Sequence, residues 1–257
     1  MGIARGKNEQ RYATKHSYIF GVRAIIEAII AGRTIDKVFI DKSARSPLHK
    51  ELRILLQTYA MPHSYVPRAR LNKITPKNHQ GAIAYLAPIT FSCLNQVVQA
   101  SYETGKTPCI VLLDGITDVR NFGAIVRTAS CADVDAVVIP TQGCASLSGD
   151  VMKTSAGALA HVSICRVSKL SMAITLLKAC GLKVVACTEH AAQSIYQTTL
   201  TLPIAFLLGS EGGGISPHNL QLVDQCMAIP TLGPIASLNV SVAAAVALYE
   251  CRRQRGN

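Results

Sequence analysis

The sequence has no tryptophan and only 5% aromatic residues. It therefore offers little material for the broad base-stacking surfaces of single-strand binding proteins. Its longest apolar runs, such as Cys109–Leu113 and Ile204–Leu208, are far shorter than the roughly 20 residues of a membrane-spanning helix. No apolar signal segment follows the basic amino terminus. These absences predict a cytoplasmic protein with no membrane partner.

Cysteine is present but lacks the spacing of a functional motif. The 9 cysteines are scattered, with no Cys-x-x-Cys pair and none at ligand spacing from a histidine. Such a distribution favours buried, reduced thiols over a disulfide framework or a metal centre. The 257 residues, 49% of them hydrophobic, are enough for one large or two modest domains.

The net charge of +11 is concentrated in the first third of the chain. Residues 1–90 contain 15 Lys and Arg against 5 Asp and Glu, a balance of +10, whereas residues 91–257 contain 11 against 10. A basic leader attached to a near-neutral remainder is typical of an enzyme that acts on a polyanion, because phosphate neutralisation provides most sequence-independent affinity for nucleic acid. The alternative is a merely solvated basic surface.

The first part of the chain predicts a basic arm followed by a small α/β unit and a linker. Residues 1–15 are polar and basic, with no apolar period, and indicate a flexible arm. Residues 16–90 contain alternating helical and strand patterns, and residues 91–107 are expected to form a linker with one helix. The expected helices and strands of the unit are a helix through Ile25–Ile30 that ends at Gly32, a strand at Lys37–Ile40, a helix at Leu48–Tyr59 and a strand at Gly81–Leu86.

Residues 108–257 alternate strand and helix patterns, which predicts a largely parallel sheet covered on both faces. Several of the strand candidates are apolar throughout, as expected of strands that are covered on both faces. The strand candidates are Cys109–Leu113, Ala136–Ile139, Val162–Cys165, Lys183–Cys187, Ile204–Leu208 and Met227–Ile229.

The first of three informative segments follows the strand that ends at Leu113. It reads Asn-Phe-Gly-Ala-Ile-Val-Arg-Thr-Ala over residues 121–129. Its apolar residues recur at helical spacing and predict a buried stripe. Asn121 lies at the expected start of this helix, where it either caps the helix or has a functional role. Arg127 lies off the stripe, and taken alone it is a solvated arginine. The stripe consists of Phe122, Ile125, Val126 and Ala129.

The second segment, Leu-Gly-Ser-Glu-Gly-Gly-Gly over residues 208–214, ends an apolar strand in a glycine-rich turn. Backbone amides of such a turn can approach a ligand closely, which makes Gly209 a candidate contact. The segment lacks the Lys-Ser/Thr end of a phosphate-binding loop and the spacing of a dinucleotide fingerprint. Glu211 is either a carboxylate that caps the next short helix, near Ser216, or a site residue.

The third segment, residues 229–241, runs from a strand end through Gly233-Pro234 into the carboxy-terminal helix, expected from about Leu238 to Arg253. Ser237 and Asn239 lie at the entrance of this helix, where capping alone would account for them. The helix is expected to carry an apolar stripe and to end in arginines that complement its dipole. The stripe consists of Val242, Val246 and Tyr249, and the arginines are Arg252, Arg253 and Arg255.

Together, in this order, the three segments resemble the signature motifs of the SpoU/TrmH branch of the SPOUT methyltransferases. The resemblance implies transfer of a methyl group from S-adenosylmethionine to a ribose 2'-hydroxyl of RNA, without a metal, by a homodimer. It also implies a catalytic SPOUT domain over residues 108–257 with a carboxy-terminal trefoil knot. Phe20-Gly21-Val22 and His79-Gln80-Gly81 resemble the L30e-like RNA-binding domain that precedes the catalytic domain in one subset of the family. For His79 the alternative is a loop histidine that caps the following strand.

The resemblance also assigns roles to residues of this chain. Arg127 matches the arginine that holds the phosphate next to the target and helps to activate the ribose hydroxyl, a role suited to its bidentate guanidinium. The implied catalytic residues are Arg127, Asn121, Glu211, Ser237 and Asn239, and the implied cofactor contacts are backbone groups of Gly209, Ile229 and Leu238.

The leader domain favours a guanosine of 23S ribosomal RNA as the target, with RNA rather than DNA as the partner. Two alternatives remain open. One is the same reaction on transfer RNA, and the other is a non-catalytic RNA-binding or ribosome-assembly factor with the same fold.

Overall fold

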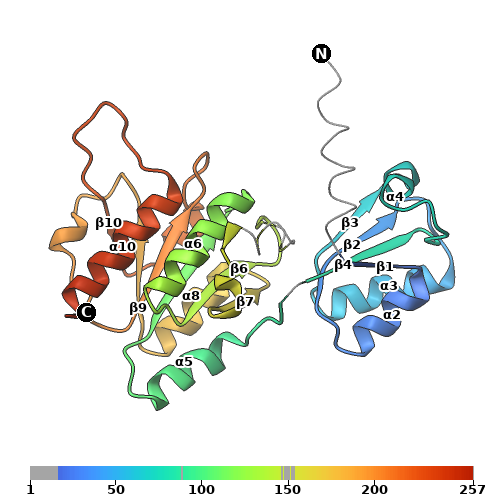
Figure 1. Ribbon diagram of the computed structural model, residues 1–257, viewed down its shortest axis with the longest axis horizontal. Helices are drawn as coiled ribbons and strands as arrows, with labels where there is room; N and C mark the ends of the chain where they lie inside the picture. Colours follow the sequence, from blue (N-terminus) through green and yellow to red (C-terminus); the bar gives the residue numbers. More distant parts are fainter. Residues whose placement is uncertain (1–16, 88, 146, 148–150, 152–153, 257) are drawn as a thin grey trace. The chain divides into compact units, whose positions relative to one another are not determined.

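The computed structural model describes residues 17–87, 89–145, 147, 151 and 154–256. The expected arm at 1–15 lies outside the described residues. The described chain divides near residue 90 into two compact units, which are drawn in blue to teal and in green to red in Figure 1. Within the described residues, no helix is both long and apolar enough to cross a membrane.

The first unit is a four-stranded mixed sheet with the strand order β1-β4-β2-β3. Strand β4 pairs antiparallel with both β1 and β2, and β3 runs parallel to β2. The strands are β1 (Tyr18–Phe20), β2 (Ile35–Asp41), β3 (His63–Val66) and β4 (Ala82–Leu86), and the helices are α2 (Val22–Ile30), α3 (Pro47–Thr58) and α4 (Arg68–Ile74). The elements expected in this unit are present, while β1, β3 and α4 went unpredicted because they are short.

The two faces of this sheet are covered differently because successive strand residues point to opposite sides. Helices α2 and α3 pack against each other and against the face that carries Val38, Ile40 and Ala84. The opposite face carries Phe39 and Tyr85 and packs with the short helix α4. The larger apolar core therefore lies on the α2 and α3 side, and a smaller one lies on the α4 side.

The turn before β4 is held by His79, which is only 3% exposed. Its Nδ1 accepts a hydrogen bond from the backbone N–H of Gly81 at 3.0 Å, so its Nε2 carries the proton and donates to Asn72 Oδ1 at 2.8 Å. Burial, followed by the charge of Arg68, lowers the pKa of His79. This geometry supports the interpretation of His79 as a histidine that caps the following strand.

The second unit is a six-stranded sheet, parallel throughout, with the order β10-β8-β9-β5-β6-β7. This confirms the expected parallel α/β architecture. The strands are β5 (Cys109–Asp114), β6 (Ala136–Pro140), β7 (Ser163–Val167), β8 (Lys183–Cys187), β9 (Ile204–Gly209) and β10 (Gln225–Met227). The helices are α5 (Leu94–Glu103), α6 (Val119–Cys131), α8 (Leu170–Ala179), α9 (Pro217–Leu220) and α10 (Val240–Gln254), with short 3-10 turns η1 (Ala158–Ala160) and η2 (Ile195–Gln197).

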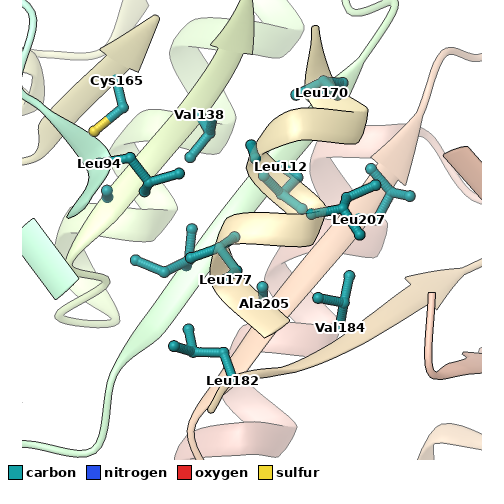
Figure 2. Packing of buried hydrophobic residues seen from close by; sticks show 14 of the residues in the cluster. Leu94, Leu112, Val138, Cys165, Leu170, Leu177, Leu182, Val184, Ala205 and Leu207 are labelled. Carbon is teal, nitrogen blue, oxygen red and sulfur yellow. The ribbon is translucent and has the colours of Figure 1, made fainter. Parts of the chain in front are cut away.

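Helices cover both faces of this sheet. Helices α5 and α8 pack on one face, where Leu94 and Leu177 meet strand residues such as Leu112 and Leu207 (Figure 2). Helices α6 and α10 lie side by side and contact each other (Figure 1). The predicted stripe of α6 is buried, with Phe122 and Ile125 at most 1% exposed. Both helices begin at the carboxyl edge of the sheet and end at its amino edge.

The apolar stripe predicted for the carboxy-terminal helix is not its buried face. Val242 and Tyr249 are 47% and 55% exposed. The reason is that α10 packs through a different face, which includes small residues that permit close approach to α6 and β9. The buried apolar residues of α10 are Val240, Ala244, Ala247, Leu248 and Cys251.

The last strand begins two residues earlier than predicted and ends at Met227. The backbone N–H of Ala228 donates to Gln193 at 2.8 Å, so the chain leaves β8 and pairs with the segment before η2. Ile229 consequently lies beyond the sheet edge rather than within a strand.

Candidate active site

The first and second motifs meet at the carboxyl edge of the parallel sheet. Strands β5 and β9 are neighbours, and their register places Asp114 beside Gly209. Helix α6 follows β5, and the glycine-rich turn follows β9. Adjacent parallel strands thus bring together segments about 90 residues apart, at the edge where α/β folds bind ligands.

Helix α6 begins earlier than Asn121, because Asp118 is its N-cap. The Asp118 carboxylate accepts hydrogen bonds from the backbone N–H groups of Arg120 at 2.7 Å and Asn121 at 3.2 Å. The bond from Asn121, followed by those from Arg120, lowers the pKa of Asp118. The capping interpretation of Asn121 is therefore wrong, and its side chain makes contacts elsewhere.

Asn239 joins the third motif to the other two. As the N-cap of α10, its Oδ1 accepts a hydrogen bond from the backbone N–H of Ser241 at 2.9 Å. Its Nδ2 donates to Asn121 Oδ1 at 3.1 Å and also to Glu211 Oε1. Capping and a site contact are thus combined in one side chain.

Glu211 accepts hydrogen bonds from two amide side chains and caps no helix. Asn121 Nδ2 donates to its Oε1 at 3.1 Å, beside the donation from Asn239. The N-cap of the short helix α9 is Ser216 rather than Glu211. Because α6 and α10 both begin here, their positive dipole ends favour the Glu211 carboxylate at this position.

The glycine-rich turn is closed by backbone hydrogen bonds in both directions between Ser210 and Gly214, at 3.0 and 2.8 Å. A Cβ on Gly209 would lie 2.1 Å from the carbonyl carbon of Gly214, so only glycine fits there. Asp114 Oδ2 fixes the far end of the turn, because it accepts from Ser216 N and Asn219 Nδ2, each at 2.9 Å. This role of Asp114 was not predicted, although the position of this residue directly after a buried strand could have indicated it.

A pocket of about 370 Å³ adjoins this cluster. Gly209, Glu211, Ile229, Ser237 and Leu238 line it, so five of the residues singled out from the sequence share one cavity. Another part of its wall follows the end of β8 and was not predicted, because no motif in the sequence marks it. That part consists of Thr188, Glu189 and His190.

Arg127 is the candidate that the structure does not join to this cluster. It is exposed on α6 and makes no hydrogen bond or ion pair with any described residue. Six residues separate it from Asn121, which turns its side chain to another side of the helix. The remaining candidates form either the hydrogen-bonded group of Asn121, Glu211 and Asn239 or the pocket wall. Among the described residues, no three histidine, cysteine or acidic side chains are grouped as a metal site.

Family comparisons agree with this arrangement. Residues 108–249 match the SpoU rRNA Methylase family, and residues 18–92 match the model for RNA 2'-O ribose methyltransferase substrate binding. A protein of Staphylococcus haemolyticus described as a TrmH family tRNA/rRNA methyltransferase is 34% identical, covering 92% of this chain and 95% of its own. The Bacillus subtilis protein YacO, described in the same terms, is 30% identical over 94% of this chain and 97% of its own.

Solved structures show the same fold. The SpoU methyltransferase AviRb from Streptomyces viridochromogenes, determined with the cofactor AdoMet, aligns with a TM-score of 0.59 and 23% identity, over 98% of this chain and 94% of its own. The A. aeolicus TrmH/SpoU tRNA modifying enzyme aligns with a TM-score of 0.54 and 27% identity, over 63% of this chain and 84% of its own. Two domain models match the chain, and its relatives align over more than nine tenths of its length. The chain therefore belongs to the SpoU/TrmH family of RNA methyltransferases.

Proposed function

We propose that this protein transfers a methyl group from S-adenosylmethionine to the ribose 2'-hydroxyl of a guanosine in 23S ribosomal RNA. Family membership gives the coarser function of a tRNA/rRNA methyltransferase. The observation that carries the proposal is the convergence of Asn121, Glu211 and Asn239 beside one pocket at the carboxyl edge of the sheet.

The pocket suits an adenosine and methionine ligand. Its volume of about 370 Å³ lies in the range of small-molecule sites, and its wall combines apolar side chains with accessible backbone groups. Backbone of Gly209, Ile229 and Leu238 would hold the ligand. When bound, S-adenosylmethionine supplies an electrophilic methyl group. The domains are proposed as an L30e-like leader over residues 16–90, a linker over 91–107 and a knotted catalytic domain over 108–257.

The side chains of the site would align the ribose rather than act as strong acids or bases. Glu211 holds two amides, which fixes the orientation of Asn121 and Asn239. Ser237, exposed on the pocket wall, would hydrogen-bond the ribose. Arg127 is exposed, so its guanidinium is available for the neighbouring phosphate; because it stays protonated, it would assist proton removal without accepting the proton itself. Alignment of this kind provides much of the rate enhancement in group transfer.

A homodimer fits the apolar surface next to the site. Leu232 and Ile235 are 103% and 75% exposed, and Val242 and Tyr249 extend the apolar surface along α10.

The proposed dimer can be tested directly, because Arg127 is separate from the cluster of its own chain and could serve the site of a partner subunit. Arg127→Ala and Asn239→Ser subunits are unfolded and refolded together. If the two residues serve one site across the dimer, the mixture regains about a quarter of wild-type activity. If both act within one chain, the mixture stays inactive.

The choice of ribosomal RNA rests on the leader unit. The tRNA modifying enzyme of A. aeolicus aligns with only 63% of this chain, and this chain carries a further unit that matches a substrate-binding model over residues 18–92. Methyl transfer to transfer RNA remains the second candidate, since the curated relatives are described as tRNA/rRNA methyltransferases.

The proposal is tested by incubating the protein and its Arg127→Ala variant with methyl-labelled S-adenosylmethionine and unmodified ribosomal or transfer RNA. The expected product is 2'-O-methylguanosine in 23S RNA, lost in the variant. Label in transfer RNA alone would favour the second candidate. Binding of the cofactor without transfer to either RNA, or to ribosomal assembly intermediates, would favour a non-catalytic assembly factor.

A further inference from the structure

The α4 side of the small sheet carries a continuous row of four aromatic rings. The row crosses three neighbouring strands, from Phe20 and Tyr18 on β1 to Tyr85 on β4 and Phe39 on β2. Successive ring centroids lie 6.3, 6.3 and 5.8 Å apart, with the last two pairs edge to face. Four of the 13 aromatic residues of the chain therefore lie on one face of this sheet.

Cationic side chains lie over both ends of this row. Lys77 Nζ lies 5.7 Å from the centroid of Phe20. At the other end, Lys37 and Arg70 lie 5.5 and 5.2 Å from the centroid of Phe39. Cation and ring attract each other in this geometry, so the positive charges are held at the surface.

Among residues 17–87, which the structure describes, no exposed carboxylate lies on this face of the sheet. Four acidic residues occur in this range, against 11 Lys and Arg. Glu27 and Glu51 belong to α2 and α3, which cover the opposite face. Asp36 and Asp41 are only 5% and 3% exposed. The exposed carboxylates of this unit thus lie on the α2 and α3 side, whereas Arg68, Arg70 and Lys73 are all exposed on α4.

The rings are not all sealed in the core. Phe39 and Tyr85 are 9% exposed, but Tyr18 and Phe20 at the β1 end are only partly buried. The partly exposed rings can stack with the bases of an unpaired nucleic-acid strand, and the cations at both ends of the row can pair with its phosphates.

We infer that the aromatic row of Phe20, Tyr18, Tyr85 and Phe39, with Lys37, Arg70 and Lys77, binds an unpaired segment of the substrate RNA, such as a loop or a bulge. This inference rests on the proposed function and adds to it where and in what form the RNA is bound. Bases stack at the Tyr18 and Phe20 end, and phosphates pair with the cations. The partner is RNA because charge complementarity excludes a basic protein surface and the same residues match a substrate-binding model.

The charge is tested in the full-length protein with a labelled RNA hairpin that carries a loop of unpaired nucleotides. Arg70→Ala/Lys77→Ala is compared with Arg33→Ala/Lys50→Ala, which removes the same charge from exposed positions at the α2 and α3 side. The α4-side variant is expected to weaken binding about tenfold or more and to lower the salt slope by about 2, with a small change in the control. Equal losses in both variants would overturn the inference.

Stacking is tested with Phe20→Leu, which keeps apolar packing, and with Tyr59→Leu at the end of α3 as a matched control. We expect Phe20→Leu to weaken binding of the hairpin several-fold but to leave binding of a fully paired duplex of equal length unchanged. Equal effects on both RNAs, or none on either, would contradict the assignment. Transfer of the labelled methyl group to RNA by the wild-type protein is measured in parallel. If this transfer is intact and the variants bind RNA normally, only the RNA-binding inference fails. If the wild-type protein transfers no label, the proposed function itself fails.

Discussion

The two edges of the six-stranded sheet differ in what their polar side chains do. At the carboxyl edge, Asn121, Glu211 and Asn239 bond to one another across three chain segments while Glu211 and Asn239 remain exposed. At the amino edge, polar side chains bind backbone. Arg255 donates to the carbonyl groups of Thr107 and Leu202, each at 2.7 Å.

Other groups at the amino edge follow the same rule. Arg252 donates to the carbonyl oxygens of Ala132 and Asp133, each at 2.6 Å, and Asp135 accepts from the N–H of Cys109 at 2.8 Å. These bonds satisfy backbone groups at the ends of strands and helices, which would otherwise lose their hydrogen bonds to water on folding. The comparison indicates that the amino edge stabilises the fold, whereas the carboxyl edge leaves polar groups for a ligand. Substitutions at each edge can test that division.

The largest effect is expected for Asn239→Ser. Serine retains an N-cap oxygen for α10 but replaces the two amide N–H groups that reach Asn121 and Glu211 with one hydroxyl proton on a shorter side chain. The site therefore loses its central link while the helix keeps its cap. We expect methyl transfer to fall about 100-fold or more, with little change in the free energy of unfolding. Single-turnover transfer and denaturant unfolding measure the two. Full activity in this variant would show that the amide is dispensable.

Gly209→Ala is expected to act on cofactor affinity. The added methyl would meet Gly214 backbone at 2.1 Å and displace the turn. We expect the dissociation constant for S-adenosylmethionine to rise by roughly a factor of ten to a hundred, because small displacements of a binding loop are costly. Calorimetric titration measures it. Gly212→Ala is the matched control, since no atom lies within 4 Å of a Cβ there, and an equal loss in that variant would argue against a steric cause.

A smaller change in affinity is expected for Asp114→Ala, which releases Ser216 and Asn219 from the end of the turn. The cofactor dissociation constant should rise by less than about tenfold, because the Ser210–Gly214 bonds remain. Asp135→Ala removes a comparable bond from the other end of β5 and should leave this constant unchanged. If both variants bind the cofactor equally poorly, the division between the edges is wrong.

Arg255→Ala should lower stability and spare the reaction. Loss of its hydrogen bonds to carbonyl groups is expected to reduce the free energy of unfolding by about 1.5 to 3 kcal/mol. Denaturant unfolding measures this, and kcat at a temperature below the transition should remain at the wild-type value. A fall in kcat without a fall in stability would contradict a structural role.

The smallest effect concerns Glu250, whose carboxylate accepts two bonds from Arg253 at 2.8 Å. These bonds, and one from Gln254, lower the pKa of Glu250 to about 2 from 4.5. Since the folded pKa is the lower one, the stabilisation is present above pH 4.5 and is lost as pH falls toward 2. Glu250→Gln should lower the free energy of unfolding by about 1 kcal/mol at pH 7, a small value because Arg253 is exposed to solvent. Near pH 2 the variant and the wild type should be equally stable. If the difference in stability between variant and wild type did not depend on pH, ionisation of Glu250 would not be its cause.

Much of the fold follows from local patterns. Apolar runs located five of the six strands of the parallel sheet, and the stripe of Phe122, Ile125 and Ala129 identified the buried face of α6. The same reasoning chose the wrong face of α10, because alanines supply its close contacts and larger residues were given more weight. Short elements such as β3 and α4 have too few residues for a period to be recognised.

Composition alone does not show where the aromatic residues lie. Only 5% of the residues are aromatic, and the pairing of β1, β4 and β2 aligns Tyr18, Tyr85 and Phe39 in one row. Composition counts residues, whereas strand order and register decide which of them become neighbours.

The alternation of strands and helices, the basic first third and the three motifs could all be predicted before the structure, because each depends on residues close together in the chain. Strand order and helix packing settled that Asn239 both caps α10 and binds Asn121, and that Arg127 stands apart. Those contacts depend on strand order and on which side of a helix each residue faces. No local pattern encodes them, because the segments that meet are about 90 to 120 residues apart.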